Sequence, residues 1–185
     1  MSVTIGIMQS YLFPYMGYME LIASVDKFVL YDDAKYIKGG WMNRNYYPKP
    51  FTFRLKKHAD SAKINECFFF DVEEDKVKFS RKTGIVSPHV ALLTQKDNLA
   101  INCERTLKSL CSTFGIHTPF YRSSEIPHGT SVQGVLDMVR ALEGDTYLNL
   151  PGGKSLYHQD QFGDITLKFL ETTPGPSALC YAEGL

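Results

Sequence analysis

The sequence lacks the features that mark several classes of protein. Its 20 lysines and arginines balance 20 aspartates and glutamates, so the formal net charge is zero. Without a broad basic surface or an acidic tail, the chain fits nucleic-acid binding poorly. No apolar run reaches the length that a bilayer requires, and no signal peptide is recognisable. We therefore expect a soluble, cytoplasmic protein with neither nucleic acid nor membrane as a partner.

Metal-binding and nucleophile patterns are also scarce. The four cysteines show no C-x-x-C spacing, and Cys103 and Cys111 fall on the apolar face of an expected helix, which favours buried thiols. The five histidines are scattered without the spacing of metal ligands, so no zinc site is predicted. Ser123 and Ser124 lack a G-x-S-x-G motif, which favours a turn over a serine nucleophile.

The densest pattern lies in the first forty-five residues. Residues 3–8 alternate apolar and small side chains, as a short strand does, and residues 27–31 form a second strand-like run. Between them, apolar residues recur at helical spacing at Tyr18, Leu21, Ile22 and Val25. A helix this short connects only neighbouring parallel strands. The segment therefore predicts a Rossmann-like strand–helix–strand start.

In such a unit, ligands bind outside the carboxyl ends of the strands. The first turn, from Gln9 to Gly17, and the pair Asp32-Asp33 lie at that rim. The helix start offers free N–H groups to a phosphate, and Gly17 permits close approach; the alternative is an ordinary turn with tyrosines packed around it. One aspartate is expected to face a ligand, as a general base or Mg²⁺ ligand, unless the pair only caps a turn.

The next loop carries the strongest binding signal. Residues 34–45 have no period and include the only tryptophan, and the candidate ligand-binding residues are Lys38, Trp41, Asn43, Arg44 and Asn45. Arginine and lysine side chains bind phosphate or carboxylate groups, a tryptophan ring stacks on a base or sugar, and the asparagine amides hydrogen-bond to hydroxyl or amide groups. The alternative is a solvated basic loop with its tryptophan folded onto the core.

The rest of the chain alternates helices and strands. Strands are expected at 51–55 and 64–70 as an antiparallel hairpin, and at 120–122, 146–149 and 165–169; helices are expected at 74–82, from Asn98 to Phe114, and from a capping box at 130–133 to Gly144. Residues 84–96 are expected to be loop. Gly152-Gly153-Lys154 resembles a phosphate loop in outline, although a tight turn is the commoner use of such a sequence.

These elements predict an α/β fold with a mostly parallel sheet and a short antiparallel hairpin insertion. A single domain is expected over residues 1–172. Residues 173–185, which include Pro174-Gly175-Pro176-Ser177, show no periodicity and are expected to form a loose tail.

Two sets of motifs resemble the WbqC-like proteins. The first comprises the runs 7–18 and 25–33 and the loop from Lys38 to Asn45; the second comprises residues 146–153 with Leu156, Tyr157, Phe162 and 167–170. Members of this family commonly sit among genes for O-antigen and other surface polysaccharides, and some near other biosynthetic clusters. The resemblance implies a place in such a pathway more firmly than it implies a reaction.

A fainter resemblance is to nucleotidyltransferases of the H-x-G-H type. Where those enzymes carry two histidines that stabilise a phosphoryl transition state, this sequence has Tyr15 and Tyr18, with Gly17 between them. Tyrosine is not cationic near neutral pH, so adenylyl transfer by that mechanism is not expected. Binding of a nucleotide or nucleotide-sugar is compatible with the replacement.

Two functions of different classes follow. The first is a transferase that moves an acyl or aminoacyl group to an activated amino sugar or related phosphorylated metabolite, with Asp32, Asp33 and Tyr18 as candidate catalytic residues. Its expected ligand contacts are Gln9, Tyr11, Tyr15, Gly17, Lys38, Trp41, Asn43, Arg44, Asn45, Gly152 and Gly153. Mg²⁺ is the one cofactor considered. The second is a non-catalytic nucleotide- or sugar-binding or scaffold protein that partners an enzyme of the same pathway.

Overall fold

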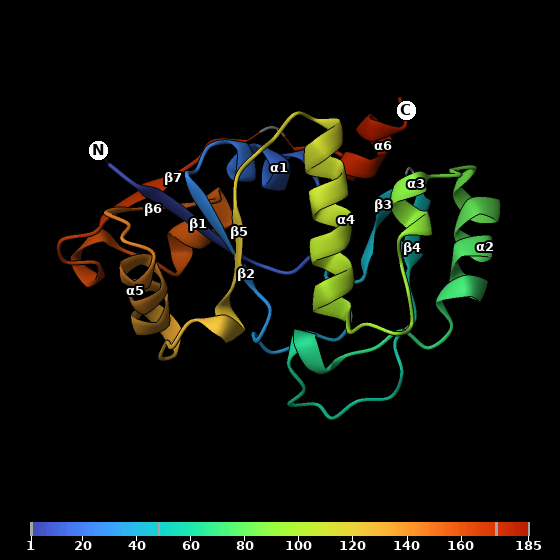
Figure 1. The fold of residues 1–185 in the computed structure, drawn as a ribbon, viewed down its shortest axis with the longest axis horizontal. Coiled ribbons are helices and arrows are strands. Elements are labelled where there is room, and N and C mark those ends of the chain that lie inside the picture. The colour runs from blue at the N-terminus through green and yellow to red at the C-terminus, as the bar shows by residue number, and fades with distance from the viewer. Residues whose placement is uncertain (1, 48, 173, 185) are drawn as a thin grey trace.

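The chain folds around a five-stranded parallel sheet with helices against both faces, as Figure 1 shows. The computed structural model describes residues 2–47, 49–172 and 174–184. The sheet runs in the order β5 (Phe120–Arg122), β2 (Lys27–Tyr31), β1 (Thr4–Gln9), β6 (Thr146–Asn149) and β7 (Thr166–Phe169), with every neighbouring pair parallel. The chain builds outward from β1 in one direction and then in the other. The order therefore reverses between β1 and β6.

Alternation along the strands divides the buried side chains between two cores. Ile5 and Ile7 of β1 pack in one cluster with α5 (Ser131–Ala141). Phe28 and Leu30 of β2 belong to a larger cluster that includes side chains of α1 (Met16–Ala23) and α4 (Leu99–Thr113). Successive residues of a strand face opposite sides of a sheet, so both faces bury apolar surface. The predicted α/β class and parallel sheet are confirmed.

Several helices begin and end where local signals place them. The apolar stripe of α1 is buried, and α2 (Val72–Thr83) covers the helix expected at 74–82. Asn98 caps α4, because its side chain accepts a hydrogen bond of 2.9 Å from the N–H of Ile101. Gly115 follows α4 with a φ of +68°, the left-handed conformation that glycine adopts at helix ends.

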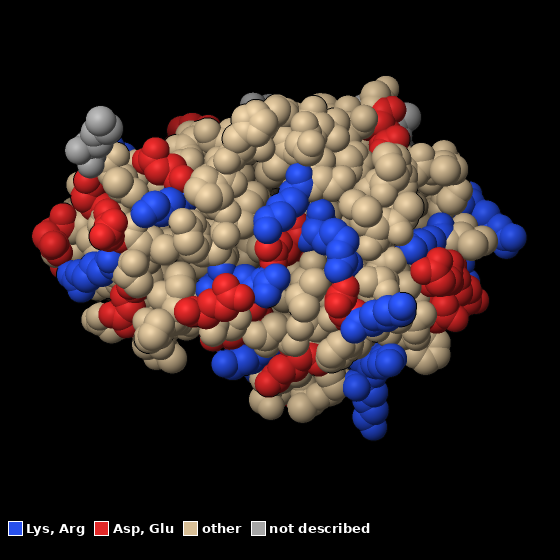
Figure 2. Space-filling view, viewed as in Figure 1, with Lys and Arg blue, Asp and Glu red and all other residues tan. Residues whose placement is uncertain are grey.

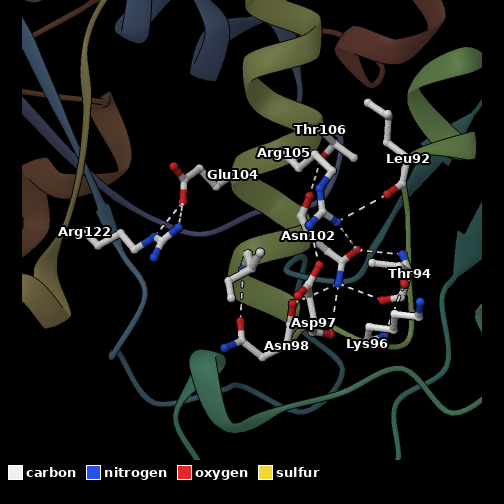
Figure 3. A network of polar contacts seen from close by, with 11 residues as sticks. Leu92, Thr94, Lys96, Asp97, Asn98, Asn102, Glu104, Arg105, Thr106 and Arg122 are labelled. Carbon is white, nitrogen blue, oxygen red and sulfur yellow. Dashed lines mark hydrogen bonds and ion pairs between the residues drawn. The ribbon is translucent and has the colours of Figure 1, made fainter.

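A buried amide fastens the preceding loop to the first turns of α4 (Figure 3). The Asn102 side chain accepts from the N–H of Thr94 and donates to the carbonyls of Thr94, Asp97 and Asn98, over 2.9 to 3.1 Å. On another side of the same helix, Glu104 pairs with Arg122 of β5 over 2.6 Å. These contacts join α4 both to the loop and to the edge strand of the sheet.

The hairpin insertion exists, but its strands are not the expected ones. β3 (Arg44–Tyr47) and β4 (Lys49–Thr52) pair antiparallel, and Pro50 is tolerated in β4 because both strands of a two-stranded sheet are edges. Residues 51–55 leave the ladder after Thr52. The segment 64–70 begins with a short 3-10 helix, η1 (Ile64–Glu66), and only an isolated bridge joins Leu55 to Phe69. The strict alternation of apolar and polar residues at 51–55 predicted a longer strand than the backbone forms there.

Smaller differences concern loops and caps. The segment expected to be loop at 84–96 contains α3 (Pro88–Ala91), with Ser87 as its cap. The capping box at 130–133 is absent, because Thr130 makes no side-chain cap bond and Gln133 instead donates to Asp137. The remaining short 3-10 helices are η2 (Ser123–Glu125), η3 (Pro151–Ser155) and η4 (Gln159–Gln161).

The carboxyl-terminal segment differs from the loose tail that was expected. Residues 178–182 form α6 (Ala178–Ala182), and the side chains of Ala178, Leu179 and Cys180 lie in the larger core. Ser177 is buried and its hydroxyl accepts from the N–H of Leu179, capping this helix. Five residues are too few to show a helical period in the sequence. Residues 173 and 185, at the ends of the expected tail, lie outside the described residues.

Charged side chains of both signs are interspersed over the face of the molecule seen in Figure 2, so neither sign forms one broad patch there. Within the described ranges, no helix combines the length and the apolar character needed to cross a bilayer.

Candidate functional site

A cavity of about 710 Å³ lies at the carboxyl ends of β1 and β6, where the strand order reverses. Gln9, the last residue of β1, and Asn149, the last residue of β6, both line it. Open parallel sheets bind ligands at this position, because the loops that follow the two strands diverge to opposite faces and leave a crevice. The cavity is therefore the principal candidate site.

The wall of this cavity carries no charge in its described part, and neutral polar groups lie in it beside apolar side chains such as Ile7, Met8, Val135 and Leu150. Three amides line it, from Gln9, Asn45 and Asn149, together with six tyrosines, Tyr11, Tyr15, Tyr31, Tyr46, Tyr147 and Tyr157. Among the described lining residues there is no lysine, arginine, histidine, aspartate or glutamate. Burial raises the pKa of Tyr11, and burial with the neighbouring Asp33 raises that of Tyr31, so these hydroxyls stay protonated at neutral pH. The wall offers neutral donors, neutral acceptors and aromatic faces.

The first turn brings Tyr11 and Tyr15 to the cavity by way of a strained residue. Phe13 is buried with a φ of +50°, a conformation that costs a non-glycine residue about 1 kcal/mol or more. Its carbonyl accepts hydrogen bonds from the Asn45 amide at 2.8 Å and from the Ser177 hydroxyl at 2.6 Å. Two side chains distant in sequence thus hold the turn in place.

Two of the expected site residues in this turn have structural positions. Tyr18 is fully buried and its hydroxyl donates to the carbonyl of Gln9 over 2.8 Å, so it supports the end of β1 and does not reach the cavity. Gly17 is buried as well. A Cβ on it would lie 2.6 Å from the Tyr15 ring and 2.8 Å from the Thr172 side chain, so glycine here permits close packing.

The turn after β6 forms the opposite side. Gly152 and Gly153, the first glycines of η3, both line the cavity, whereas Lys154 points to an ion pair with Glu171. The Asn149 side chain accepts from the N–H of Leu150 at 2.8 Å. A Cβ on Gly153 would lie 2.3 Å from the Asn149 amide nitrogen, so this glycine makes room for the amide that lines the site.

The two aspartates lie beside the cavity rather than in its wall. Both carboxylate oxygens of Asp32 accept hydrogen bonds from Ser123 and Ser124, and its side chain is buried. Asp33 accepts from Ser123 at 2.5 Å and lies 3.3 Å from the His128 ring nitrogen Nε2 and 3.5 Å from the Lys63 ammonium. Burial would raise the pKa of Asp33, but these three partners together hold it below its usual range.

This acidic pair joins the carboxyl ends of β2 and β5, which explains its burial. The His128 ring packs edge-on against Tyr31, with ring centroids 5.6 Å apart, and Tyr31 in turn lines the cavity. One tyrosine ring therefore separates the Asp33–His128 pair from the ligand space.

The expected ligand contacts in the loop between β2 and β3 do not all lie at the cavity. Trp41 and Asn45 line the cavity, but Asn43 is buried, accepting from the Tyr36 hydroxyl and donating to the carbonyl of Phe53. The Arg44 guanidinium stacks over the Trp41 ring, 5.4 Å from its centroid. Lys38 lines a separate pocket of about 310 Å³ together with Lys35, Tyr36, Ile37, His58 and Asp60. Ile37 borders both pockets.

The structure also adds cavity-lining residues that were not among the expected ligand contacts. Asn149, Tyr31, Tyr157 and Tyr46 line the cavity beside the expected contacts. Asn149 and Tyr31 end predicted strands, so their place at the rim was a recoverable signal. Tyr157 belongs to the second set of motifs that resemble the WbqC-like proteins, but no local pattern marks it as a ligand contact, and it reaches the cavity through the path of the chain after η3. Across the described part of the chain, no group of three or more His, Cys, Asp or Glu side chains is arranged to hold a metal ion.

Comparison with known proteins places the chain among its relatives. It is 25% identical over 187 residues to the uncharacterized protein Rv1507c of Mycobacterium tuberculosis (strain ATCC 25618 / H37Rv), covering 89% of this chain and 79% of that protein. No solved structure matches it significantly. The model of the WbqC-like protein family matches residues 9–178, which include the first turn, the loop before β3, β6 and the buried Ser177. This protein belongs to the WbqC-like family.

Proposed function

We propose that this protein binds the sugar portion of an activated sugar, or a similar polyhydroxylated metabolite, in the cavity between the ends of β1 and β6. The observation that carries the proposal is the neutral wall of amides and tyrosines. Amides and phenols donate to and accept from hydroxyl groups, while aromatic faces pack on the apolar faces of a sugar ring. An ionised group in this space would have no counter-charge in the described wall. Burying such an unpaired charge costs more free energy than burying a hydroxyl that is hydrogen-bonded.

A phosphate or nucleotide portion of the ligand would lie outside this wall. Arg44, behind Trp41, and Lys38, in the neighbouring pocket, are the expected cationic contacts nearest to it. Both lie on the loop between β2 and β3 that also carries cavity-lining residues. Family membership supports a role in surface-polysaccharide or other biosynthesis, the setting in which activated sugars are made.

The test is a binding measurement by calorimetry with free monosaccharides, N-acetylated amino sugars, and UDP- and dTDP-sugars, each with and without Mg²⁺. Gln9→Ala removes a wall amide that has no other side-chain partner among the described residues. Loss of one hydrogen bond predicts about fivefold to tenfold weaker binding. Gln133→Ala, which removes the same group from α5 outside the cavity, is the matched control and should bind normally. Absence of binding by every sugar class would refute the proposal.

A second candidate function is transfer of an acyl or aminoacyl group to the bound sugar. The observation in its favour is the Asp33–His128 pair, which is separated from the cavity by the Tyr31 ring: on rotation of that ring, the pair would reach an amine of the bound sugar and accept its proton as the amine displaces the acyl donor's leaving group. Asp33→Asn should then abolish turnover while the sugar still binds with its normal affinity. If the unaltered protein binds the sugar but does not turn it over, and a pathway enzyme co-purifies with it, the non-catalytic binding role is favoured instead.

A further inference from the structure

Large apolar side chains stand exposed around the opening of the cavity. Ile37, Trp41, Tyr46 and Leu156 all line it, yet each remains between 45% and 66% exposed. We call these four residues the collar. Their exposure contrasts with the polar groups deeper in the same space, which come from the ends of β1 and β6. Apolar groups gathered at one opening mark a surface that binds something apolar.

The collar is built by two separate segments of the chain, and local contacts hold it in place. The Trp41 ring contacts both the Arg44 guanidinium and the Tyr46 ring, whose centroid lies 5.9 Å away. Ile37 precedes a tight turn in which Gly40 donates to its carbonyl at 3.0 Å. From the other segment, the N–H of Leu156 donates to the carbonyl of Gly153 at 2.9 Å. A collar with this backbone support is a preformed surface.

The charged groups near the opening do not interrupt this apolar surface. The Arg44 guanidinium lies over the Trp41 ring, and Lys38 faces the smaller pocket on the other side of Ile37. A group that leaves the cavity therefore passes first a mixed wall of amides, tyrosines and aliphatic side chains and then the apolar collar. This order of polarity matches a ligand with a hydroxylated head and an apolar tail.

We propose that the ligand is amphipathic, with its sugar head in the cavity and an alkyl or comparable apolar group against the collar. The inference rests on the proposed function for the identity of the head, whereas the collar alone carries the argument for the tail. Water leaves apolar surface on both partners when the tail binds, so affinity should rise with each methylene that reaches the collar. A transferred acyl group or an apolar aglycone would both present such a tail.

The test is a calorimetric series of methyl, butyl, hexyl and octyl glycosides of glucose and N-acetylglucosamine, below their micelle-forming concentrations. Each added methylene should tighten binding about two- to fourfold until the chain passes the collar. The matching sugar 1-phosphates form the competing arm. If the phosphates bind more tightly than the octyl glycosides, or if methyl and octyl glycosides bind equally, the apolar tail is refuted.

Two variants distinguish binding at the collar from nonspecific binding of the alkyl chain to other exposed apolar side chains. Leu156→Ser should remove most of the gain from chain length, so that the ratio of octyl to methyl glycoside affinity falls several-fold. Val86→Ser removes a more exposed apolar side chain that does not line the cavity, and it should leave the whole series unchanged. Equal loss in both variants would overturn the inference.

Two further arms distinguish the sources of failure. The n-alkanols of equal length test the collar without a sugar: if glycosides bind no better than these alkanols, the proposed sugar function fails while the collar stands. Light scattering reports the oligomeric state at the working concentration. A dimer that Leu156→Ser dissociates would show that a second copy covers the collar, and would overturn the inference. Failure of both octyl glycosides and octanol to bind would overturn it as well.

Discussion

The hydroxyl of Ser177 donates a hydrogen bond of 2.6 Å to the carbonyl of Phe13, which is 164 positions earlier in the chain. The bond ties the segment before α6 to the turn that supplies Tyr11 and Tyr15 to the cavity. The same hydroxyl caps α6. A single buried oxygen therefore couples the carboxyl-terminal helix to the geometry of the candidate site.

Ser177→Ala should destabilise the protein by about 1–3 kcal/mol, because it removes a helix cap and leaves the Phe13 carbonyl with one partner fewer. Urea unfolding followed by circular dichroism measures the change. Ser61→Ala, at an exposed position for which the structure describes no side-chain bond, is the control and should stay within about 0.5 kcal/mol. A Ser177→Ala value as small as the control would contradict the coupling.

Gly153→Ala and Gly152→Ala should behave differently although they are neighbours. A Cβ on Gly153 would collide with the Asn149 amide at 2.3 Å, whereas one on Gly152 would meet no atom within 4 Å. We expect Gly153→Ala to cost about 1–3 kcal/mol of stability, because the amide or the turn must shift. Its sugar affinity should also fall. Thermal unfolding and calorimetry on the pair measure both effects, and equal behaviour of the two variants would show that the turn is more adaptable than its packing indicates.

Asn102→Ala should release the loop that precedes α4 (Figure 3). The side chain is fully buried and bonds four backbone groups of residues 94–98, and removing it takes this partner from all four groups. We expect a loss of about 2–4 kcal/mol and faster hydrogen exchange at the Thr94 amide. Lys78→Ala removes an exposed i,i+4 pair from α2 and should cost under about 0.5 kcal/mol. Unchanged exchange at Thr94 would be the contrary result.

Asp33→Asn should change how stability depends on pH. The folded-state pKa of Asp33 lies below its usual range, so the carboxylate contributes stability above the unfolded-state pKa of about 4, and this contribution is lost as the pH falls through the folded-state pKa. The difference in unfolding free energy between the unaltered protein and Asp33→Asn should shrink below about pH 4. Urea titrations from neutral to acidic pH measure it.

The control for that titration is Asp160→Asn, on an exposed aspartate for which the described structure contains no ion pair. It should leave the pH profile unchanged. A difference for Asp33→Asn that is the same at all pH values would mean that its partners act through packing and not through its charge.

The cysteines should be unreactive in the folded protein. All four are buried and unpaired within the described chain, and burial raises the pKa of Cys67 to about 11 and that of Cys111 to about 12, and raises that of Cys103 as well. Thiolate is the reactive form, so a disulfide reagent should label all four thiols in denaturant and label them only slowly in native protein. Rapid native labelling of any one thiol would reveal local opening around it.

The amino-acid sequence by itself determined the local elements. The stripe of α1, the run of β2, the Asn98 cap of α4 and the strand β6 all follow from residues within a few positions of one another. Such signals are visible because helical and strand periods repeat over short distances. The same short range made the first turn, Trp41 and the glycines after β6 visible as candidate ligand contacts.

Only the tertiary structure decided which candidates share one site. Gln9 and Asn149 meet because β6 pairs with β1, and no local pattern states which strands are neighbours. The same packing turned Tyr18 and Asn43 inward and placed Asp33 behind Tyr31. It also buried residues 177–180, where Ser177 bonds a carbonyl 164 positions earlier in the chain. The physical reason is that burial and strand order minimise the free energy of the whole chain, whereas periodicity reports the preference of one segment alone.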